Sequence, residues 1–285
     1  MDVINEFDPW DSEMCTCPEK YSLNPYTGCG HRCIYCYSTY IPNFFEPRRK
    51  KNVVERVKKD VKKIPEGSLI SISNSSDPYI PKDEEHGDTR EILKILKKED
   101  MKVLVVTKGV HVRRDIDVLK KMHSAVTISI STLKEDIQEK LEPNAPSPRT
   151  RLDLVKSLAV EGISVGVRFD PIFPELTESE IPRVVRKVEE AGAEHIVSST
   201  FKPRGDSWKR FKLAFPEIAE DLEELYFEEG EKIDNSYYVP EEKRKEILGT
   251  VAKECEENDI PFATCREDLP TLKTSASCDG SHLLK

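Results

Sequence analysis

The sequence lacks any run of about 18 or more apolar residues, so it contains no segment typical of a membrane-spanning helix. Its first residues, MDVINEFDPWDSE, are acidic and lack the basic and then apolar pattern of a secretory signal. The chain also has no internal repeat of short period and no low-complexity segment. We therefore expect a cytoplasmic protein with no membrane partner.

An overall positive charge is lacking too, because the formal net charge is −9 at pH 7. This argues against a protein that coats nucleic acid in general. The charge is uneven, however. Residues 48–63 carry nine basic and two acidic side chains, whereas residues 217–259 carry sixteen acidic and five basic ones. The whole-chain charge thus hides a basic segment and an acidic one.

Apolar runs of strand length alternate with helical patterns over the first 200 residues. The expected strands are 21–26, 69–74, 102–107, 125–132, 163–171 and 194–200. Helical patterns between them include 90–100, 115–122, 151–162 and 177–192. This alternation predicts a parallel sheet covered by helices. Six such units form either an open doubly wound sheet or a partial (β/α) barrel.

The pattern changes near residue 200. Two acidic helical stretches follow, at about 206–229 and 240–258, and then a short strand-like segment, PFATC, and a tail rich in serine and threonine. We therefore divide the chain into three parts. They are an N-terminal segment with Cys-x-Cys (1–20), a barrel (21–200) and a C-terminal extension with a cysteine-containing tail (201–285).

Three cysteines lie close together directly after the first expected strand. Cys29, Cys33 and Cys36 have the spacing C-x3-C-x2-C. Thiolates are soft ligands that suit zinc or an iron–sulfur cluster. Structural zinc needs four protein ligands, so zinc here would require His31 or a distant cysteine as well. A four-iron cluster has four corners, and three cysteines leave one iron open for a molecule that must react.

This spacing, with Tyr35 before the last cysteine, resembles the radical S-adenosylmethionine (SAM) enzymes. The segments NPYTGCGHRCIYCY, SSDP, TKG, RRDIDVL, SIST, LEPNAPSPRTRL and RFDPIFP resemble the branch that contains spore photoproduct lyase. The similarity covers about residues 20–200. It implies an α/β fold with a partial (β/α)6 TIM-like barrel, to which the pattern after residue 200 adds a helical, acidic C-terminal extension.

The resemblance also implies cofactors and a reaction. The cofactors are a 4Fe-4S cluster with one open iron and SAM, which the open iron binds. An electron donor such as a ferredoxin or a flavodoxin would supply the electron that cleaves SAM to a 5′-deoxyadenosyl radical. That radical abstracts hydrogen from a substrate. A nucleic acid is the expected substrate, with RNA or protein modification as the nearest rivals. A non-enzymatic iron–sulfur electron carrier or a zinc protein is the alternative from a different class.

Polar residues at strand ends are candidates for the SAM site, since reactive groups in β/α barrels gather where strands end. By the resemblance, Ser76 and Asp77 match a SAM-contacting stretch, and Lys108 matches a lysine that meets the methionine carboxylate. For the serine, ordinary turn chemistry is an equal alternative.

Two further candidates follow from their places on strands. Ser131 lies near the end of the strand at 125–132, where a turn role is again the alternative. Arg168 interrupts an apolar strand, and an unpaired charge there would be costly. It therefore needs an anionic partner, either the carboxylate of SAM or an acid such as Glu142.

One position departs from the lyase. Where the lyase has a cysteine that returns hydrogen to the product radical, this chain has Asn74, and an amide does not give up a hydrogen atom readily. Tyr35 and Tyr37 match tyrosines that flank the last cluster cysteine of the lyase and are implicated there in radical transfer. They are the candidate catalytic residues, with packing around the cluster as the alternative for Tyr37.

The remaining cysteines suggest a second site. Cys15 and Cys17 precede the first strand, and Cys265 and Cys278 lie in the C-terminal tail. If the two ends of the chain meet, these four would hold an auxiliary iron–sulfur cluster or zinc; otherwise they are free thiols. Cys255 lies in a helical stretch and is expected to be a buried structural thiol.

The segment FKPRGDSWKRFKLAF (201–215) interleaves cations with aromatic rings after the last barrel strand. Cations that meet phosphates and rings that stack on bases are typical of a nucleic-acid site. The alternative is the start of a helix with ordinary packing aromatics. The basic residues 48–63 extend such a site or form a solvated helix face.

Overall fold

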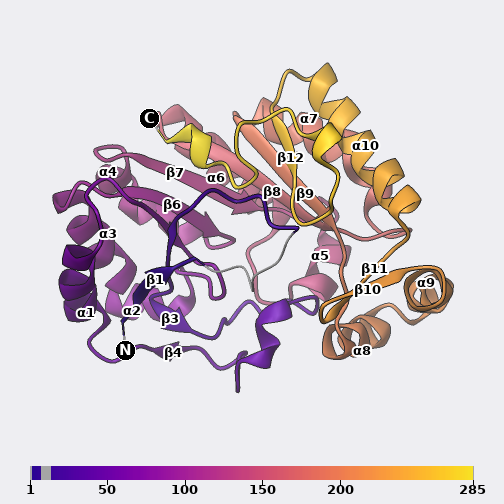
Figure 1. The fold of residues 1–285 in the computed structure, drawn as a ribbon, viewed down its shortest axis with the longest axis horizontal. Coiled ribbons are helices and arrows are strands. Elements are labelled where there is room, and N and C mark those ends of the chain that lie inside the picture. Colours follow the sequence, from indigo (N-terminus) through magenta and orange to yellow (C-terminus); the bar gives the residue numbers. More distant parts are fainter. Residues whose placement is uncertain (1, 8–13, 285) are drawn as a thin grey trace.

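An eight-stranded sheet forms the centre of the computed structural model, which describes residues 2–7 and 14–284 (Figure 1). Its strands, in spatial order, are β1 (Ile4–Glu6), β2 (Tyr21–Leu23), β5 (Leu69–Ile72), β6 (Lys102–Thr107), β7 (Ser124–Ser129), β8 (Ser164–Ile172), β9 (His195–Thr200) and β12 (Phe262–Thr264). β1 runs antiparallel to β2, and the other neighbours are parallel.

Two short ribbons and a series of helices complete the fold. The ribbons pair β3 (Tyr26–Thr27) with β4 (Arg48–Arg49), and β10 (Glu231–Ile233) with β11 (Ser236–Tyr238). The helices are α1 (Val53–Asp60), α2 (Pro81–His86), α3 (Asp88–Lys98), α4 (Ile116–Leu119), α5 (Glu135–Leu141), α6 (Pro148–Val160), α7 (Ile181–Glu190), α8 (Gly205–Ala214), α9 (Pro216–Phe227) and α10 (Glu241–Glu257). In the described part of the chain, none of these is long and apolar enough to span a membrane.

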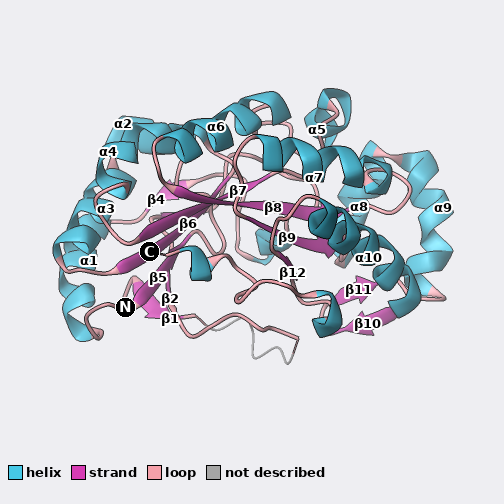
Figure 2. Cartoon of the chain, turned by 90° about the horizontal axis from the view of Figure 1, so that it is seen from above, coloured by secondary structure: helices cyan, strands magenta, loops and turns pink. Residues whose placement is uncertain are grey.

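The helices cover the outer face of the curved sheet, as Figure 2 shows. Successive side chains of a strand point to opposite faces, so every second residue meets the helices. On β7 these are Val126 and Ile128, which pack in one core with residues such as Leu93 of α3 and Val185 of α7. The order and direction of the strands confirm the expected α/β class and partial (β/α) barrel.

The inner face of the sheet carries smaller and more polar side chains. Thr127 and Ser129 of β7 and Arg168 of β8 point to this side and line a cavity. In a closed barrel, bulky branched residues fill the interior. Here the barrel is open and its inner residues are small, so the interior keeps a space of about 550 Å³.

The C-terminal extension is joined to the barrel in two ways. β12 adds to the edge of the sheet beside β9, and α10 packs in the same core as α7. The tail then crosses the inner face, where Leu283 packs against Leu104 and Ala125 (Figure 2). The sequence places six strands in the barrel, whereas the sheet also includes β1 and β12 at its edges. β12 lies within PFATC, the strand-like segment of the sequence, but its place in the sheet was not predicted, and β1 is three residues long, too short to show a periodic pattern.

Candidate active site

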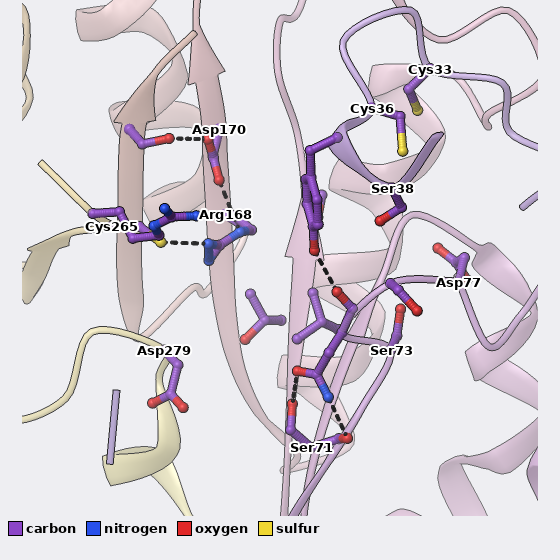
Figure 3. Close-up of a pocket in the computed structure, with 18 of the residues that line it drawn as sticks. Cys33, Cys36, Ser38, Ser71, Ser73, Asp77, Arg168, Asp170, Cys265 and Asp279 are labelled. Atoms are coloured by element: carbon purple, nitrogen blue, oxygen red, sulfur yellow. Dashed lines mark hydrogen bonds and ion pairs between the residues drawn. The ribbon is translucent and has the colours of Figure 1, made fainter. Parts of the chain in front are cut away.

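The three-cysteine loop follows β2 and forms one wall of the cavity. Gly28 begins the loop with φ +84°, and the amide of Cys29 donates to the Phe44 carbonyl at 2.8 Å. A Cβ atom on Gly28 would lie 2.5 Å from that same carbonyl oxygen, so glycine is required there. Cys29, Cys33 and Cys36 all line the cavity, and Figure 3 shows the last two on one side of it.

The three thiols of this loop are suitable ligands for a four-iron cluster that keeps one iron open. In the described ranges, no three His, Cys, Asp or Glu side chains already surround a common point. Burial raises the pKa of Cys29 to about 12, with Asp77 adding to the effect, so metal binding would release protons from such thiols. His31 is not free to complete a zinc site, because its Nε2 lies 3.2 Å from Asp77 and its Nδ1 lies 3.3 Å from the Asn144 carbonyl.

Helix α8 supports the loop from outside. Arg210 donates from Nε to the Ile34 carbonyl at 2.8 Å and from Nη2 to the Cys36 carbonyl at 3.0 Å. Asp206 accepts from the hydroxyl of Thr39 and pairs with Arg210 at 2.8 Å. The cations of the segment 201–215 therefore include one that fixes the cysteine loop.

The aromatic rings of that segment do not form a stacking surface. Phe201, Trp208 and Phe211 are buried and pack with Tyr226 in a second apolar core. Their positions match the alternative, a helix with packing aromatics. Among the cations, Lys202 pairs with the buried Glu267 at 2.7 Å. Base stacking on these rings, one of the two readings of the sequence, is thus wrong.

Asp77 connects the cysteine loop to the end of β6. It accepts hydrogen bonds from the Thr107 hydroxyl and the Lys108 amide, both at 2.7 Å, and it lies beside His31. Burial alone would raise the pKa of Asp77, but His31 and these donors lower it to about 2. Its carboxylate is therefore charged and committed to structural partners.

Lys108 shares a buried carboxylate with Arg151. The Lys108 ammonium lies 3.9 Å from Glu142, and Arg151 contacts the other oxygen of Glu142 at 2.5 Å. The hydroxyl groups of Tyr35 and Ser131 also donate to Glu142, the latter at 2.9 Å. Burial alone would raise the pKa of Glu142, but the two cations lower it to about 2. Lys108 lines the cavity, and Ser131 is buried in this network instead.

Burial also affects the pKa values of Lys108 and Tyr35 in this network. Burial alone would lower the pKa of Lys108, but Glu142 outweighs it and the pKa is raised. Burial, with Glu142 next, raises the pKa of Tyr35 well above its usual value. Lys108 is thus a fixed cation at the cavity wall, and Tyr35 is a protonated hydrogen-bond donor.

Arg168 lies across the cavity from the cysteine loop (Figure 3). Its Nε lies 3.0 Å from Asp170, and its Nη2 donates to the sulfur of Cys265 at 3.1 Å. Arg168 thus has an acidic partner, as the sequence predicts, but this acid is Asp170 and not Glu142, which pairs with Arg151. Asp170 also accepts from the hydroxyl of Ser199.

The remaining candidates lie in different surroundings. Tyr37 is 40% exposed at the cavity and donates to the Asn74 carbonyl at 2.5 Å. Ser76 is buried behind the cavity wall, and its hydroxyl makes no hydrogen bond within the described residues. Its amide, with those of Asn74 and Ser75, donates to the side chain of Asn24.

The four outlying cysteines come together from the two ends of the chain. The sulfurs of Cys17 and Cys278 lie 3.4 Å apart, and Cys15 is two residues from Cys17 in the chain. Cys15, Cys17 and Cys265 line the same cavity as the three-cysteine loop. Cys255 is buried in the main core, on α10.

Sequence reasoning missed three residues that shape the site: Asn24, Arg151 and Asp170. Asn24 and Arg151 lie within segments that carry the family resemblance, but their partners are distant in the chain. Asp170 had a local signal, since it follows Arg168 by two residues on β8 and so faces the same side.

Comparison with known proteins places this site in a family. An uncharacterised protein of Acidianus two-tailed virus is 28% identical over 240 residues, covering 74% of this chain and 79% of the viral one. One from Methanocaldococcus jannaschii is 31% identical over 170 residues, covering 56% of this chain and 63% of its own.

Solved structures share the fold. A mutant of spore photoproduct lyase with bound AdoMet and dinucleoside spore photoproduct has a TM-score of 0.69 at 19% identity, covering 86% of this chain and 75% of that one. SuiB of Streptococcus suis, bound to S-adenosylmethionine, has a TM-score of 0.59 at 13% identity, covering 85% and 49%. The family profile described as Radical SAM superfamily matches residues 23–188, more than half of the chain. The protein therefore belongs to the radical SAM superfamily and is a radical SAM enzyme.

Proposed function

We propose that Cys29, Cys33 and Cys36 hold a 4Fe-4S cluster, that SAM binds in the adjoining cavity, and that the substrate is a nucleic acid. One observation carries the proposal: the three thiols of one loop face a cavity of about 550 Å³ that also exposes a fixed cation, Lys108. This volume lies in the range of about 300–1,000 Å³ typical of small-molecule sites.

When bound, the cluster and SAM supply a 5′-deoxyadenosyl radical that abstracts a hydrogen atom from the substrate. The residues of the chain hold and orient the participants. Lys108, held by Glu142 and 15% exposed, presents an ammonium group suited to the carboxylate of an amino acid. Asp77 positions the Lys108 backbone and His31, so its role is to fix the wall of the cavity. Arg168 offers a second cation on the opposite side.

The two tyrosines have different roles in this proposal. Tyr35 donates its hydroxyl to the buried Glu142 and packs edge-on against Phe173, with ring centroids 5.7 Å apart. These contacts suit a positioning residue. Tyr37 is 40% exposed and lies at the cavity, so it is the tyrosine that a substrate would meet.

The mouth of the cavity supports a nucleic-acid substrate. Tyr37 and Tyr40, the latter 59% exposed, line the cavity, and the Arg204 guanidinium lies 5.9 Å from the Tyr37 ring centroid. Exposed rings beside a cation suit stacking on a base and contact with a phosphate. A base in a duplex must be extruded to reach the cavity, so single-stranded regions are the favoured substrates.

Cleavage of SAM tests the chemistry. Anaerobic reconstitution with iron and sulfide, followed by SAM and dithionite, is expected to give 5′-deoxyadenosine. Replacing Cys29, Cys33 and Cys36 together by alanine should abolish it, whereas Cys255→Ala, which removes a thiol far from the cavity, should not. Cleavage that persists in the triple variant contradicts the assignment. A reconstituted wild type that takes up iron but cleaves no SAM points to an electron-transfer protein.

A binding measurement tests the substrate class. Fluorescence anisotropy with labelled single-stranded DNA, RNA and an unrelated peptide should show binding to nucleic acid that weakens as salt is raised. Tyr40→Ala should lower this affinity about 5-fold to 100-fold, the loss of one stacked base. Leu213→Ala, on an 85% exposed residue of α8, is the matched control. Binding to the peptide alone would favour protein modification.

Reversal of spore photoproduct is expected to be weak or absent. Asn74 uses its amide to donate to Ser22 at 2.8 Å and to the Ser71 carbonyl at 3.0 Å, and it carries no hydrogen atom that a radical takes readily. Liquid chromatography of irradiated spore-type DNA after incubation with the reconstituted enzyme measures the outcome. Efficient and clean reversal by the wild type would show this inference wrong.

A further inference from the structure

Four thiols from opposite ends of the sequence meet at the open edge of the barrel. We call them the terminal thiol cluster; its members are Cys15, Cys17, Cys265 and Cys278. The sulfurs of Cys17 and Cys278 are 3.4 Å apart. Cys15 is two residues from Cys17 in the chain, and Cys15, Cys17 and Cys265 line the same cavity. All four are free thiols in the described chain.

Contacts that do not involve the thiols hold the two ends together. Lys20 and Asp279, whose side chains are 3% and 9% exposed, form an ion pair beside Cys17 and Cys278. The tail is folded, because the hydroxyl of Ser277 lies 2.7 Å from Nδ1 of His282 and Leu283 packs on the sheet. Figure 3 shows Asp279 below Cys265 on the same side of the cavity. The meeting of the ends is therefore part of the fold.

The contact between Cys17 and Cys278 favours a single metal ion. Four sulfurs at about 2.3 Å around one zinc lie about 3.8 Å from one another, close to the contact between Cys17 and Cys278. In a four-iron cluster each sulfur binds a different iron, so the sulfurs lie farther apart. No three potential ligands among the described residues already surround one point. Binding therefore requires side-chain rotation within the cluster, starting from the pair already in contact.

The surroundings also suit thiolates. Arg168 donates to the sulfur of Cys265 at 3.1 Å, the kind of contact that orients a metal ligand. Lys20 lies near Cys17 and offsets part of the negative charge that four thiolates would bring. Both cations also have a carboxylate partner, Asp170 and Asp279 respectively.

We propose that the terminal thiol cluster binds one zinc ion through four sulfurs, which links the two ends of the chain where they already meet. This site does not include the cysteines of the three-cysteine loop. The zinc proposal can therefore be wrong while the proposed SAM chemistry is right, and the SAM chemistry can be wrong while the zinc proposal is right. Because Cys15, Cys17 and Cys265 line the cavity, the zinc would form part of its wall.

Metal analysis of the full chain, purified anaerobically, tests the site. The wild type should contain about one zinc per chain in addition to its iron. The variant Cys17→Ser/Cys278→Ser should lose at least nine-tenths of the zinc and keep the iron, which also shows that it folds. Cys255→Ser removes a cysteine buried in the main core and should keep both metals.

X-ray absorption at the zinc edge of the wild type gives a second readout that needs no variant. Four sulfur ligands at about 2.3 Å are expected. Fewer than three sulfurs, or no zinc, would overturn the proposal. Three other results would also overturn it. The first is a zinc content that is unchanged in the double variant, and the second is a Cys17–Cys278 disulfide found in the wild type by mass spectrometry. The third is a loss of iron and sulfide in the double variant that matches a second cluster.

Discussion

At Glu142 a single uncharged substitution should cost much stability. Its carboxylate is fully buried and is the shared partner of Arg151 and Lys108. The charges of these two hold its pKa at about 2 against an ordinary value of 4.5, despite the opposing effect of burial. At about 1.4 kcal/mol per unit, this corresponds to about 3 kcal/mol of stability at neutral pH. Breaking a buried ion pair typically costs about 3–5 kcal/mol, which agrees.

We therefore expect Glu142→Gln to lower the free energy of unfolding by about 3 kcal/mol, measured by urea denaturation at pH 7. Glu139→Gln removes an exposed carboxylate from α5 and should change it by less than about 0.5 kcal/mol. Adding Arg151→Met to Glu142→Gln should recover part of the loss, because the unpaired buried charge is then gone. A loss below about 1 kcal/mol in Glu142→Gln, or no recovery in the double variant, would refute the reasoning.

Three further outcomes follow from the structure. The pKa of Glu142 is depressed in the folded protein, so the difference in stability between wild type and Glu142→Gln should depend on pH. It should be constant from pH 8 to about 5 and shrink as the pH falls below 4.5 toward 2. A difference independent of pH in urea titrations would contradict this. Gly28→Ala should lose most of the bound iron, because its Cβ would lie 2.5 Å from the Phe44 carbonyl oxygen. Gly67→Ala, at φ +74° with open space around the new Cβ, should keep the iron. Equal iron in the two variants would show that this contact with the carbonyl does not matter. Lys108→Met should weaken SAM binding about 10-fold or more by calorimetry, and Lys94→Met, on the exposed face of α3, should not; equal affinity in the two variants removes Lys108 from the SAM site.

The strands of the barrel were predictable because their outward side chains are strongly apolar. In AVTISIST the residues Val126, Ile128 and Ile130 face the helices and are fully buried. The edge strand β1 carries no such signal, whereas β12 lies in the strand-like PFATC but joins the sheet by pairing with a strand more than 60 residues earlier. Nothing in three residues of local sequence specifies that pairing.

The residues of the site also fall into those that the sequence could predict and those that it could not. The cysteine loop is visible from spacing because its three thiols lie in one short segment. The pairing of Arg151 with Glu142 could not be predicted, because it depends on how α6 docks against the end of β7. The buried rings at α8 had a signal that favours packing over stacking: Trp208, Phe211 and Phe215, the last directly after the helix, are spaced by three and four residues, as on one helical face.

The tail that crosses the inner face of the sheet has a consequence for biosynthesis. Leu283 contacts Ala125, which leaves the ribosome about 160 residues earlier, and at about 5–20 residues per second this interval is roughly 8–30 s. During that time the wall formed by Cys265, Arg266 and Asp279 is missing, and the inner face of the nascent barrel is open to water. A molecule that needs the completed cavity can therefore be bound only after residues 265–283 have been made and have folded onto the sheet.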